Sequence, residues 1–255
     1  MIDAHQHFWR SIDIPGLERS FLPDDLRPLL AAAGVERTLL VQTRSSLEET
    51  RWFLELAAES GFVAGVIGWA DLTSPDLGEQ LDGLVGVRHQ VHDEPDPNWL
   101  LRPDVIRGLG AVAAAGLPYD LLVRAPQLPA ALKVASLRPE LTFVVDHLAK
   151  PRIADGPRDL EWERGLAALA DLPNVFCKLS GLVTEARWSD WTLEDLGPYV
   201  ERALGWFGPE RLIFGSDWPV CTLAGSYQQV LEAARSLVAD ERVFAANARR
   251  VYGLD

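Results

Sequence analysis

The sequence predicts an α/β protein that folds as a single (β/α)₈ TIM barrel over residues 1–255. Eight short apolar or β-branched runs recur along the chain, and helical patterns fill the gaps between them, as in a series of parallel βα units. The length is close to the roughly 250 residues of one complete barrel. No GxGxxG or GxxxxGKS/T pattern follows any of these runs, so the main nucleotide-binding reason to prefer an open sheet is missing.

The predicted strands begin roughly 20 to 37 residues apart, which leaves room for a helix and two loops in most intervals. The strands are expected at residues 1–5, 38–42, 63–69, 84–89, 119–123, 142–147, 175–180 and 212–217. The helices are expected at residues 22–33, 47–59, 104–115, 129–136, 160–172, 193–207, 227–238 and 241–252. Several of these helical segments end in glycine or proline, where a helix stop is expected.

Composition and charge narrow the class of partner. The chain is 48% hydrophobic and 24% charged, as in an ordinary globular protein. A net charge of -13 argues against nucleic acid and anionic membranes, which attract basic surfaces, and favours a small-molecule substrate. Cys177 and Cys221 are the only cysteines, and no export signal or long apolar run is found. We therefore predict a cytoplasmic protein, without a prediction for its oligomeric state.

Polar side chains collect at the ends of the predicted strands. In a TIM barrel the catalytic groups lie at the C-terminal ends of the strands, and a buried strand that ends in an ionisable group is costly unless that group is paired or functional. The residues at these positions include His5, His7, Gln42, Arg44, Arg88, His147, Lys178 and Asp217. So many polar groups at one end of the barrel predict an active site there.

Asp3, His5 and His7 alternate along the first strand, so all three are expected to point into the barrel. Two imidazoles at this spacing can bind one metal ion or polarise one carbonyl group. The HxH pattern alone is equally consistent with two hydrogen-bonded histidines of purely structural role. The rest of the sequence is needed to choose between these interpretations.

Six segments together resemble a known family. They are MIDAHQHFW, GVRHQVHDEPDPNWL, VVDHLAKP, VFCKLSG, FGSDWPV and ANARRVYGL. They resemble the sugar-lactonase group of the amidohydrolase-related (amidohydrolase 2) family, which includes L-fuconolactone and L-rhamnonolactone hydrolases and 2-pyrone-4,6-dicarboxylate lactonase. The resemblance spans most of the chain, and it implies a TIM barrel that hydrolyses an ester within a ring.

The sequence departs from the metal ligands that the resemblance implies. That superfamily draws ligands from HxH, a lysine on the fourth strand, histidines on the fifth and sixth strands, and an aspartate on the eighth. Here the fourth strand carries Arg88, and the fifth, YDLLVR, has no histidine. We therefore predict that no cofactor is required, with one divalent ion such as zinc, held by His5, His7 and Asp217, as the alternative.

The proposed chemistry is hydrolysis of a small sugar lactone, such as an aldono-1,4-lactone like L-fuconolactone. Asp217 would take a proton from water, and three imidazoles would polarise the carbonyl group. The imidazoles are those of His5, His7 and His147. The alternative for Asp217 is a turn residue before Trp218 and Pro219, and the alternative for His147 is a histidine of the core.

Further residues are predicted to bind the substrate. Arginine suits a carboxylate or vicinal hydroxyl groups, and indole rings stack on sugars. The predicted set is Gln42, Arg44, Arg88, Lys178, Trp9, Trp99 and Trp218. The alternatives are salt bridges for the arginines, a pair with Glu185 for Lys178, and core packing for the tryptophans. His89 and His92 are expected to support the site from outside or to face solvent.

Three other functions stay open at this point. One is a zinc-dependent decarboxylase of the same superfamily, against which the missing histidine of the fifth strand counts. The second is hydrolysis of a dicarboxylated lactone, although only two arginines are available at the rim for a dianion. The third is a barrel without catalytic activity that binds a sugar acid.

Overall fold

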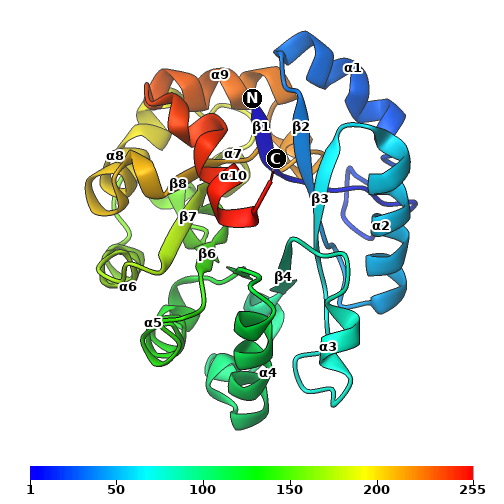
Figure 1. The fold of residues 1–255 in the computed structure, drawn as a ribbon. Helices are drawn as coiled ribbons and strands as arrows, with labels where there is room; N and C mark the ends of the chain where they lie inside the picture. Colours follow the sequence, from blue (N-terminus) through cyan, green and yellow to red (C-terminus); the bar gives the residue numbers. More distant parts are fainter. Residues whose placement is uncertain (255) are drawn as a thin grey trace.

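The computed structural model describes residues 1–254, and these form a barrel of eight parallel strands surrounded by helices (Figure 1). Each strand pairs with the next in the order β1 to β8, which confirms the predicted fold class. The strands are β1 Ile2–Gln6, β2 Arg37–Val41, β3 Val63–Gly68, β4 Gly86–His89, β5 Tyr119–Leu121, β6 Phe143–Val145, β7 Val175–Leu179 and β8 Leu212–Phe214. All eight lie within or beside the predicted segments.

The helices largely follow the prediction, with ends shifted by one or two residues. They are α1 Pro23–Ala33, α2 Leu47–Ser60, α3 Leu77–Gln80, α4 Pro103–Ala114, α5 Leu128–Leu137, α6 Leu160–Ala170, α7 Leu182–Glu185, α8 Leu193–Phe207, α9 Tyr227–Leu237 and α10 Ala246–Tyr252. The prediction lacked α3 and α7, which are too short to show helical periodicity. A 3₁₀ turn at Glu241–Phe244 precedes α10, where one continuous helix was expected. No helix within residues 1–254 is long and apolar enough to cross a membrane.

Helix α8 illustrates how the outer ring forms. Thr192 accepts a hydrogen bond from the backbone N–H of Asp195, and the side chain of Asp195 accepts from the backbone N–H of Thr192, which satisfies two free donors at the helix start. One face of the helix is buried against the barrel through Leu196, Val200, Ala203 and Phe207. These positions recur every three or four residues, so the helix covers the sheet with a single apolar stripe.

The barrel closes where β8 meets β1, through the residues that follow β8. The backbone N–H of His7 donates to the carbonyl oxygen of Trp218 at 2.7 Å, and the N–H of Asp217 donates to the carbonyl oxygen of His5 at 2.8 Å. A Cβ atom on Gly215 would lie 2.5 Å from the Cβ of His5, so only glycine permits this approach. The backbone therefore ties the functional ends of the first and last strands together.

The opposite end of the barrel is sealed by α10, which crosses it near both termini (Figure 1). Ala248 and Tyr252 pack there against a layer of inward-facing aliphatic side chains. These are Ile2, Leu39, Val41, Ile67, Val144 and Ile213. Burying each large aliphatic side chain contributes about 1.5–3 kcal/mol, so this layer forms a stable floor beneath the polar groups described next.

Candidate active site

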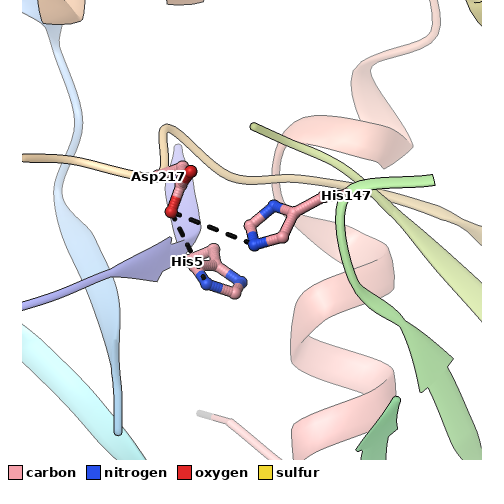
Figure 2. Close-up of side chains that lie close together, drawn as sticks. All are labelled: His5, His147 and Asp217. Atoms are coloured by element: carbon pink, nitrogen blue, oxygen red, sulfur yellow. Dashed lines mark ion pairs between the residues drawn. The ribbon is translucent and has the colours of Figure 1, made fainter. Parts of the chain in front are cut away.

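Four predicted catalytic side chains lie together at the C-terminal end of the barrel. Oδ1 of Asp217 is 3.3 Å from Nε2 of His7, 3.9 Å from Nε2 of His5 and 4.0 Å from Nε2 of His147. Figure 2 shows the His5 and His147 rings converging on the carboxylate. All four residues are buried. The structure thus brings the ends of β1, β6 and β8 to one point.

An unusual backbone turn orients His147. Four successive residues, from His147 to Lys150, have positive φ angles of 54°, 49°, 60° and 53°, and Asp217 has a φ of 59°. Left-handed backbone costs about 1–2 kcal/mol per residue other than glycine. Such strain is typical of functional sites, where the surrounding structure holds it in place. The turn places His147 against Asp217 at its start and Lys150 at its end.

Gly181 makes room for this arrangement, and the sequence analysis did not identify it. Its φ of +64° lies in the left-handed region. A Cβ atom there would lie 2.5 Å from Nδ1 of His147 and 3.2 Å from Oδ2 of Asp217. A side chain at residue 181 would therefore displace both groups.

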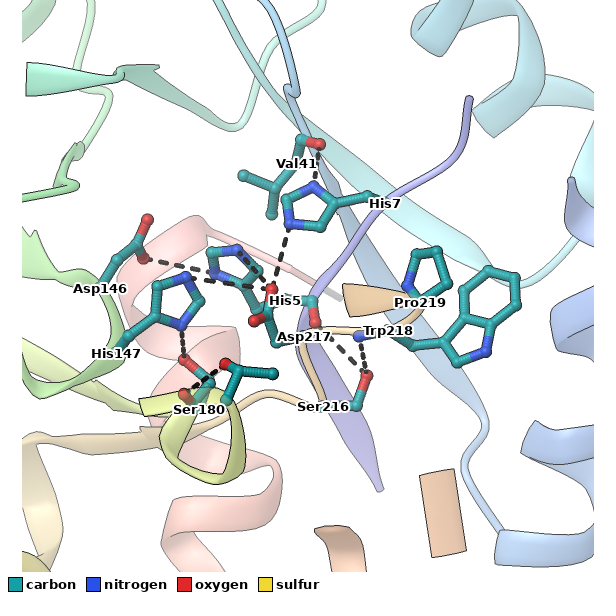
Figure 3. Close-up of polar contacts among 12 residues, drawn as sticks. His5, His7, Val41, Asp146, His147, Ser180, Ser216, Asp217, Trp218 and Pro219 are labelled. Carbon is teal, nitrogen blue, oxygen red and sulfur yellow. Dashed lines mark hydrogen bonds and ion pairs between the residues drawn. The ribbon is translucent and has the colours of Figure 1, made fainter. Parts of the chain in front are cut away.

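His7 connects β2 to Asp217, as Figure 3 shows. Its Nδ1 lies 2.7 Å from the carbonyl oxygen of Val41, which only accepts hydrogen bonds, so Nδ1 carries a proton. Its Nε2 faces the Asp217 carboxylate, which is also an acceptor when ionised. A proton shared by these two atoms, or a metal cation between them, is therefore needed.

His5 lies among three charged side chains. NH1 of Arg88 lies 3.1 Å from Nε2 of His5. Nδ1 of His5 lies 3.3 Å from Nζ of Lys178 and 3.4 Å from Oδ1 of Asp146. Burial, together with the charges of Lys178 and Arg88, holds the pKa of His5 well below its usual range although Asp146 opposes this shift. His5 is therefore neutral.

The charge states of Asp217 and His147 suit proton transfer from water. Burial raises the pKa of Asp217, but the neighbouring imidazoles of His147 and His7 outweigh this effect and lower its pKa below the ordinary value. Burial lowers the pKa of His147 well below its usual range. At neutral pH the site thus holds an ionised carboxylate beside a neutral imidazole.

Arg88 and Lys178 lie inside the barrel beneath the imidazoles. NH1 of Arg88 pairs with Oδ2 of Asp146 at 3.0 Å, and Nζ of Lys178 lies 3.0 Å from Oδ1 of Asp146 and also pairs with Asp120. Lys178, Asp120 and Asp146 are fully buried, and Arg88 is 2% exposed. Carboxylates from β5 and from the turn after β6 thus engage both cations, and the contact of Arg88 and Lys178 with substrate stays a prediction.

These carboxylates were missed in the sequence, and their environments differ. Lys178, His5 and Arg88 hold the pKa of Asp146 well below its usual range despite its burial. Burial raises the pKa of Asp120 to about 6, although Lys178 opposes this shift. The hydroxyl group of Tyr252 donates to Asp120, which links the network to the floor of the barrel. Lys178 does not contact Glu185, which instead pairs with Lys150.

Gln42 and Asp3 are both fully buried, and each has hydrogen-bond partners elsewhere in the protein. Gln42 is fully buried, and its amide nitrogen lies 3.5 Å from the carbonyl oxygen of Arg88. Asp3 accepts hydrogen bonds from the backbone of Ser216 and from the hydroxyl of Tyr227 on α9. The expectation that Asp3 points into the barrel with the two histidines was wrong, because a register shift between Asp3 and Gln6 interrupts the alternation of β1.

The predicted tryptophans and Arg44 do not surround the imidazoles. The indole N–H of Trp9 donates to the carbonyl oxygen of Arg19, and Trp218 packs edge-on against Phe21. Both indoles are 2% exposed and belong to the core, which corrects their predicted role in stacking on a sugar. Arg44 is exposed and donates to the carbonyl oxygen of Ser11 on the outer rim.

Trp99 lies over His89 at the end of β4. The two rings are parallel, with centroids 4.2 Å apart. Nδ1 of His89 accepts from the indole N–H of Trp69, so Nε2 carries the proton and donates to Glu94 at 2.6 Å. His89 therefore holds the segment after β4 in place. Of the two roles expected for His89, this agrees with support from outside the site and not with a side chain that faces solvent.

Three of these side chains lie close enough together to hold a single divalent ion. Ligand atoms of His5, His147 and Asp217 all lie within 4.8 Å of one another. Two imidazole nitrogens and one carboxylate are a common set for zinc, and the two acceptors that face each other in His7 and Asp217 also suit a cation. The group differs from the predicted one because His147 takes the place of His7.

Comparisons with known proteins agree with this geometry. A sequence model described as "Amidohydrolase" matches residues 2–254. An L-fucono-1,5-lactonase from Burkholderia ambifaria is 40% identical over 279 aligned positions, which cover 100% of this chain and 96% of that protein. An L-rhamnono-gamma-lactonase from Scheffersomyces stipitis is 27% identical, and the match covers 66% of this chain and 59% of that protein.

A solved structure extends the similarity to the whole barrel. It is a crystal structure of an amidohydrolase from Burkholderia multivorans with bound zinc, with a TM-score of 0.95 and 37% identity. The match covers 100% of this chain and 99% of that one. With the family match over nearly all residues, the fold and the cluster of imidazoles with Asp217, these findings show that the chain belongs to the amidohydrolase family.

Proposed function

We propose that the protein is a lactonase that opens the ring of a sugar lactone, with L-fucono-1,5-lactone as its substrate. The observation that supports this most is the ionised carboxylate of Asp217 among three imidazoles, in a chain 40% identical to an L-fucono-1,5-lactonase along its full length. The expected 1,4-lactone is corrected to a 1,5-lactone, because the relative with the high identity and coverage is named for the six-membered ring.

The proposed reaction begins with water held by Asp217. The carboxylate takes a proton as the water oxygen attacks the carbonyl carbon, and negative charge develops on the carbonyl oxygen. When the carbonyl group forms again, the bond between this carbon and the ring oxygen breaks. The proton on Asp217 passes to the ring oxygen, which becomes a hydroxyl group. The product is the open-chain hydroxy acid, which loses its acidic proton to solvent.

His147 is the best-placed donor to the carbonyl oxygen. Its Nδ1 lies 2.8 Å from the hydroxyl oxygen of Ser180, which donates to it when the proton of His147 is on Nε2. One well-placed donor to a developing oxyanion contributes about 2.7–4 kcal/mol. His5, by contrast, has a cation beside each ring nitrogen, Arg88 at Nε2 and Lys178 at Nδ1, so we assign it to positioning instead of the predicted donation.

A divalent ion held by His5, His147 and Asp217 would polarise the carbonyl group and acidify a bound water molecule. The protein groups described above supply a base and a donor in the same place. The proposal therefore assigns the proton transfers to this chain's own residues.

The direct test is a pH-indicator assay of the purified protein with L-fucono-1,5-lactone, corrected for uncatalysed ring opening. We expect acid release to follow the enzyme concentration and the product to be L-fuconate by mass. Release of carbon dioxide from aromatic acids would support the decarboxylase alternative instead. Binding of L-fuconate with no turnover of any lactone would support the binding barrel and overturn the proposal.

A further inference from the structure

A second group of polar side chains lies beside the catalytic cluster and takes no part in the reaction described above. His92, Arg124, Lys150 and Glu185 come from the segments that follow β4, β5, β6 and β7. We call these four residues the mouth arc. Because the C-terminal ends of parallel barrel strands meet at one rim, the arc covers one side of the barrel mouth.

Glu185 is the centre of the mouth arc. Its Oε1 lies 2.9 Å from Nζ of Lys150, and its Oε2 lies 3.3 Å from NH1 of Arg124. The side chains of Glu185 and Lys150 are only 12% and 15% exposed. An exposed ion pair contributes little to stability, and a largely buried one repays its desolvation only when its remaining polar atoms are bonded. The arc is therefore poorly explained by stability alone.

The arc lies close to the reacting groups. Lys150 ends the left-handed turn that begins with His147, and its charge lowers the pKa of both His147 and Asp217. Glu185 ends α7, a helix of four residues that follows Gly181, where an added Cβ atom would meet His147. Four helical residues span about 6 Å, which is comparable to the width of a sugar ring.

His92 adds an unused acceptor to the arc. Its Nε2 pairs with Asp93 at 3.1 Å, so the lone pair is on Nδ1 when the ring is neutral. Burial, followed by the charges of Lys150 and Arg124, lowers the pKa of His92 to about 3, which keeps the ring neutral. Nδ1 is buried and has no hydrogen-bond partner among residues 1–254.

We propose that the mouth arc is the subsite that binds the hydroxyl groups of the sugar ring. Its acceptors are both oxygens of Glu185 and Nδ1 of His92, and Lys150 and Arg124 are its donors, so the arc matches vicinal hydroxyl groups, which donate and accept. This assignment rests on the proposed lactonase function and extends it to specificity. The negative charge of Glu185 also offsets one of the two positive charges, those of Lys150 and Arg124. The arc therefore disfavours lactones that carry carboxylate groups.

The test compares wild-type protein with Glu185→Gln on two six-membered lactones, L-fucono-1,5-lactone and δ-valerolactone, which has no hydroxyl groups. We expect the ratio of kcat/KM for the sugar lactone to that for δ-valerolactone to fall about 10-fold to 100-fold, mainly through KM. Inhibition by 2-pyrone-4,6-dicarboxylate should become about tenfold tighter, because Lys150 and Arg124 lose their carboxylate partner. Glu201→Gln on the exposed face of α8 is the matched control, with an unchanged ratio.

The outcomes separate the subsite from the proposed function. An unchanged ratio and unchanged inhibition in a folded Glu185→Gln protein overturn the subsite. An equal loss on both lactones also overturns it, because it indicates a general structural effect. A wild-type protein that opens neither lactone overturns the lactonase proposal instead. In that case calorimetry with L-fuconate tests the subsite, which predicts binding that weakens at least tenfold in Glu185→Gln.

Discussion

Nε2 of His7 lies 3.3 Å from Oδ1 of Asp217, while Nδ1 of His7 is bonded to the carbonyl oxygen of Val41. This imidazole therefore has an acceptor at each nitrogen, and a proton or a cation must be shared on the side of Asp217. The relationship makes Asp217 the centre of the charge balance at the site.

Asp217→Asn should abolish most turnover and preserve the fold. The amide keeps the shape of the carboxylate, but it cannot take a proton from water. We expect kcat for L-fucono-1,5-lactone to fall about 10²-fold to 10⁴-fold, which is the usual contribution of general base catalysis. Steady-state kinetics with circular dichroism as the folding control measure this. A folded variant with nearly normal kcat would remove Asp217 from the proposed role.

The activity should show no pH limb from Asp217, His5 or His147 between pH 5 and 8. Asp217 works as the anion, and because its pKa is lowered, activity falls only as pH drops through a value below its ordinary 3.8. Burial holds the pKa of both histidines well below 6.5, so both are neutral at pH 6.5 and above, and any limb from them lies well below that pH. Profiles of kcat/KM corrected for uncatalysed hydrolysis check this. A limb near pH 6 that shifts in His147→Gln would contradict it.

Gly181→Ala should reduce both stability and activity, whereas Gly34→Ala should reduce stability alone. Both glycines have left-handed backbone, with φ angles of +64° and +66°, so each alanine costs about 1–2 kcal/mol. Only residue 181 faces His147 and Asp217, while nothing lies within 4 Å of a Cβ at residue 34. We expect kcat to fall at least tenfold in Gly181→Ala. Equal kinetics in the two variants would show that Gly181 does not position the site.

Lys178→Met should destabilise the barrel strongly, because Asp120 and Asp146 would lose a buried cation. Removing one partner of a buried ion pair costs about 3–5 kcal/mol. Urea unfolding measures this change in the free energy of unfolding. The double variant Lys178→Met with Asp120→Asn should recover part of the loss, since one carboxylate is then neutral. No recovery would mean that the pair with Asp120 does not explain the cost.

Activity should survive exhaustive chelation. The donor set suits zinc, but NH1 of Arg88 lies 3.1 Å from Nε2 of His5. The guanidinium group competes with a metal ion for this nitrogen, and its positive charge repels the ion. We therefore expect weak zinc binding by calorimetry and at most a twofold loss of kcat after dialysis against a chelator. Loss of activity that returns only when zinc is added would show that the metal is required.

Much of the fold could be predicted because the strand and helix periods are local properties of the sequence. The positions of His5, His7, His147 and Asp217 followed from one rule, that the functional ends of parallel strands meet at one rim. Helices α3 and α7 were not predicted, since four residues make little more than one turn.

The roles of Arg88 and Lys178 could not be predicted in the same way. The sequence places both on strands, but it does not show that Asp120 of β5 and Asp146 after β6 would meet them inside the barrel. The same reason applies to Trp9 and Trp218, because a position after a strand does not reveal which way a side chain turns. The arc around Glu185 was missed because its residues lie in four separate segments.

The left-handed turn from His147 to Lys150 joins the reacting groups to the mouth arc through three peptide units. A substitution in this turn would disturb both catalysis and substrate recognition. Mutagenesis that aims to change which lactones are accepted should therefore leave the turn intact. Residues 92, 124 and 185 lie on independent segments and are the natural places to diversify. Libraries built on them would explore new substrates while the chemical machinery is inherited intact.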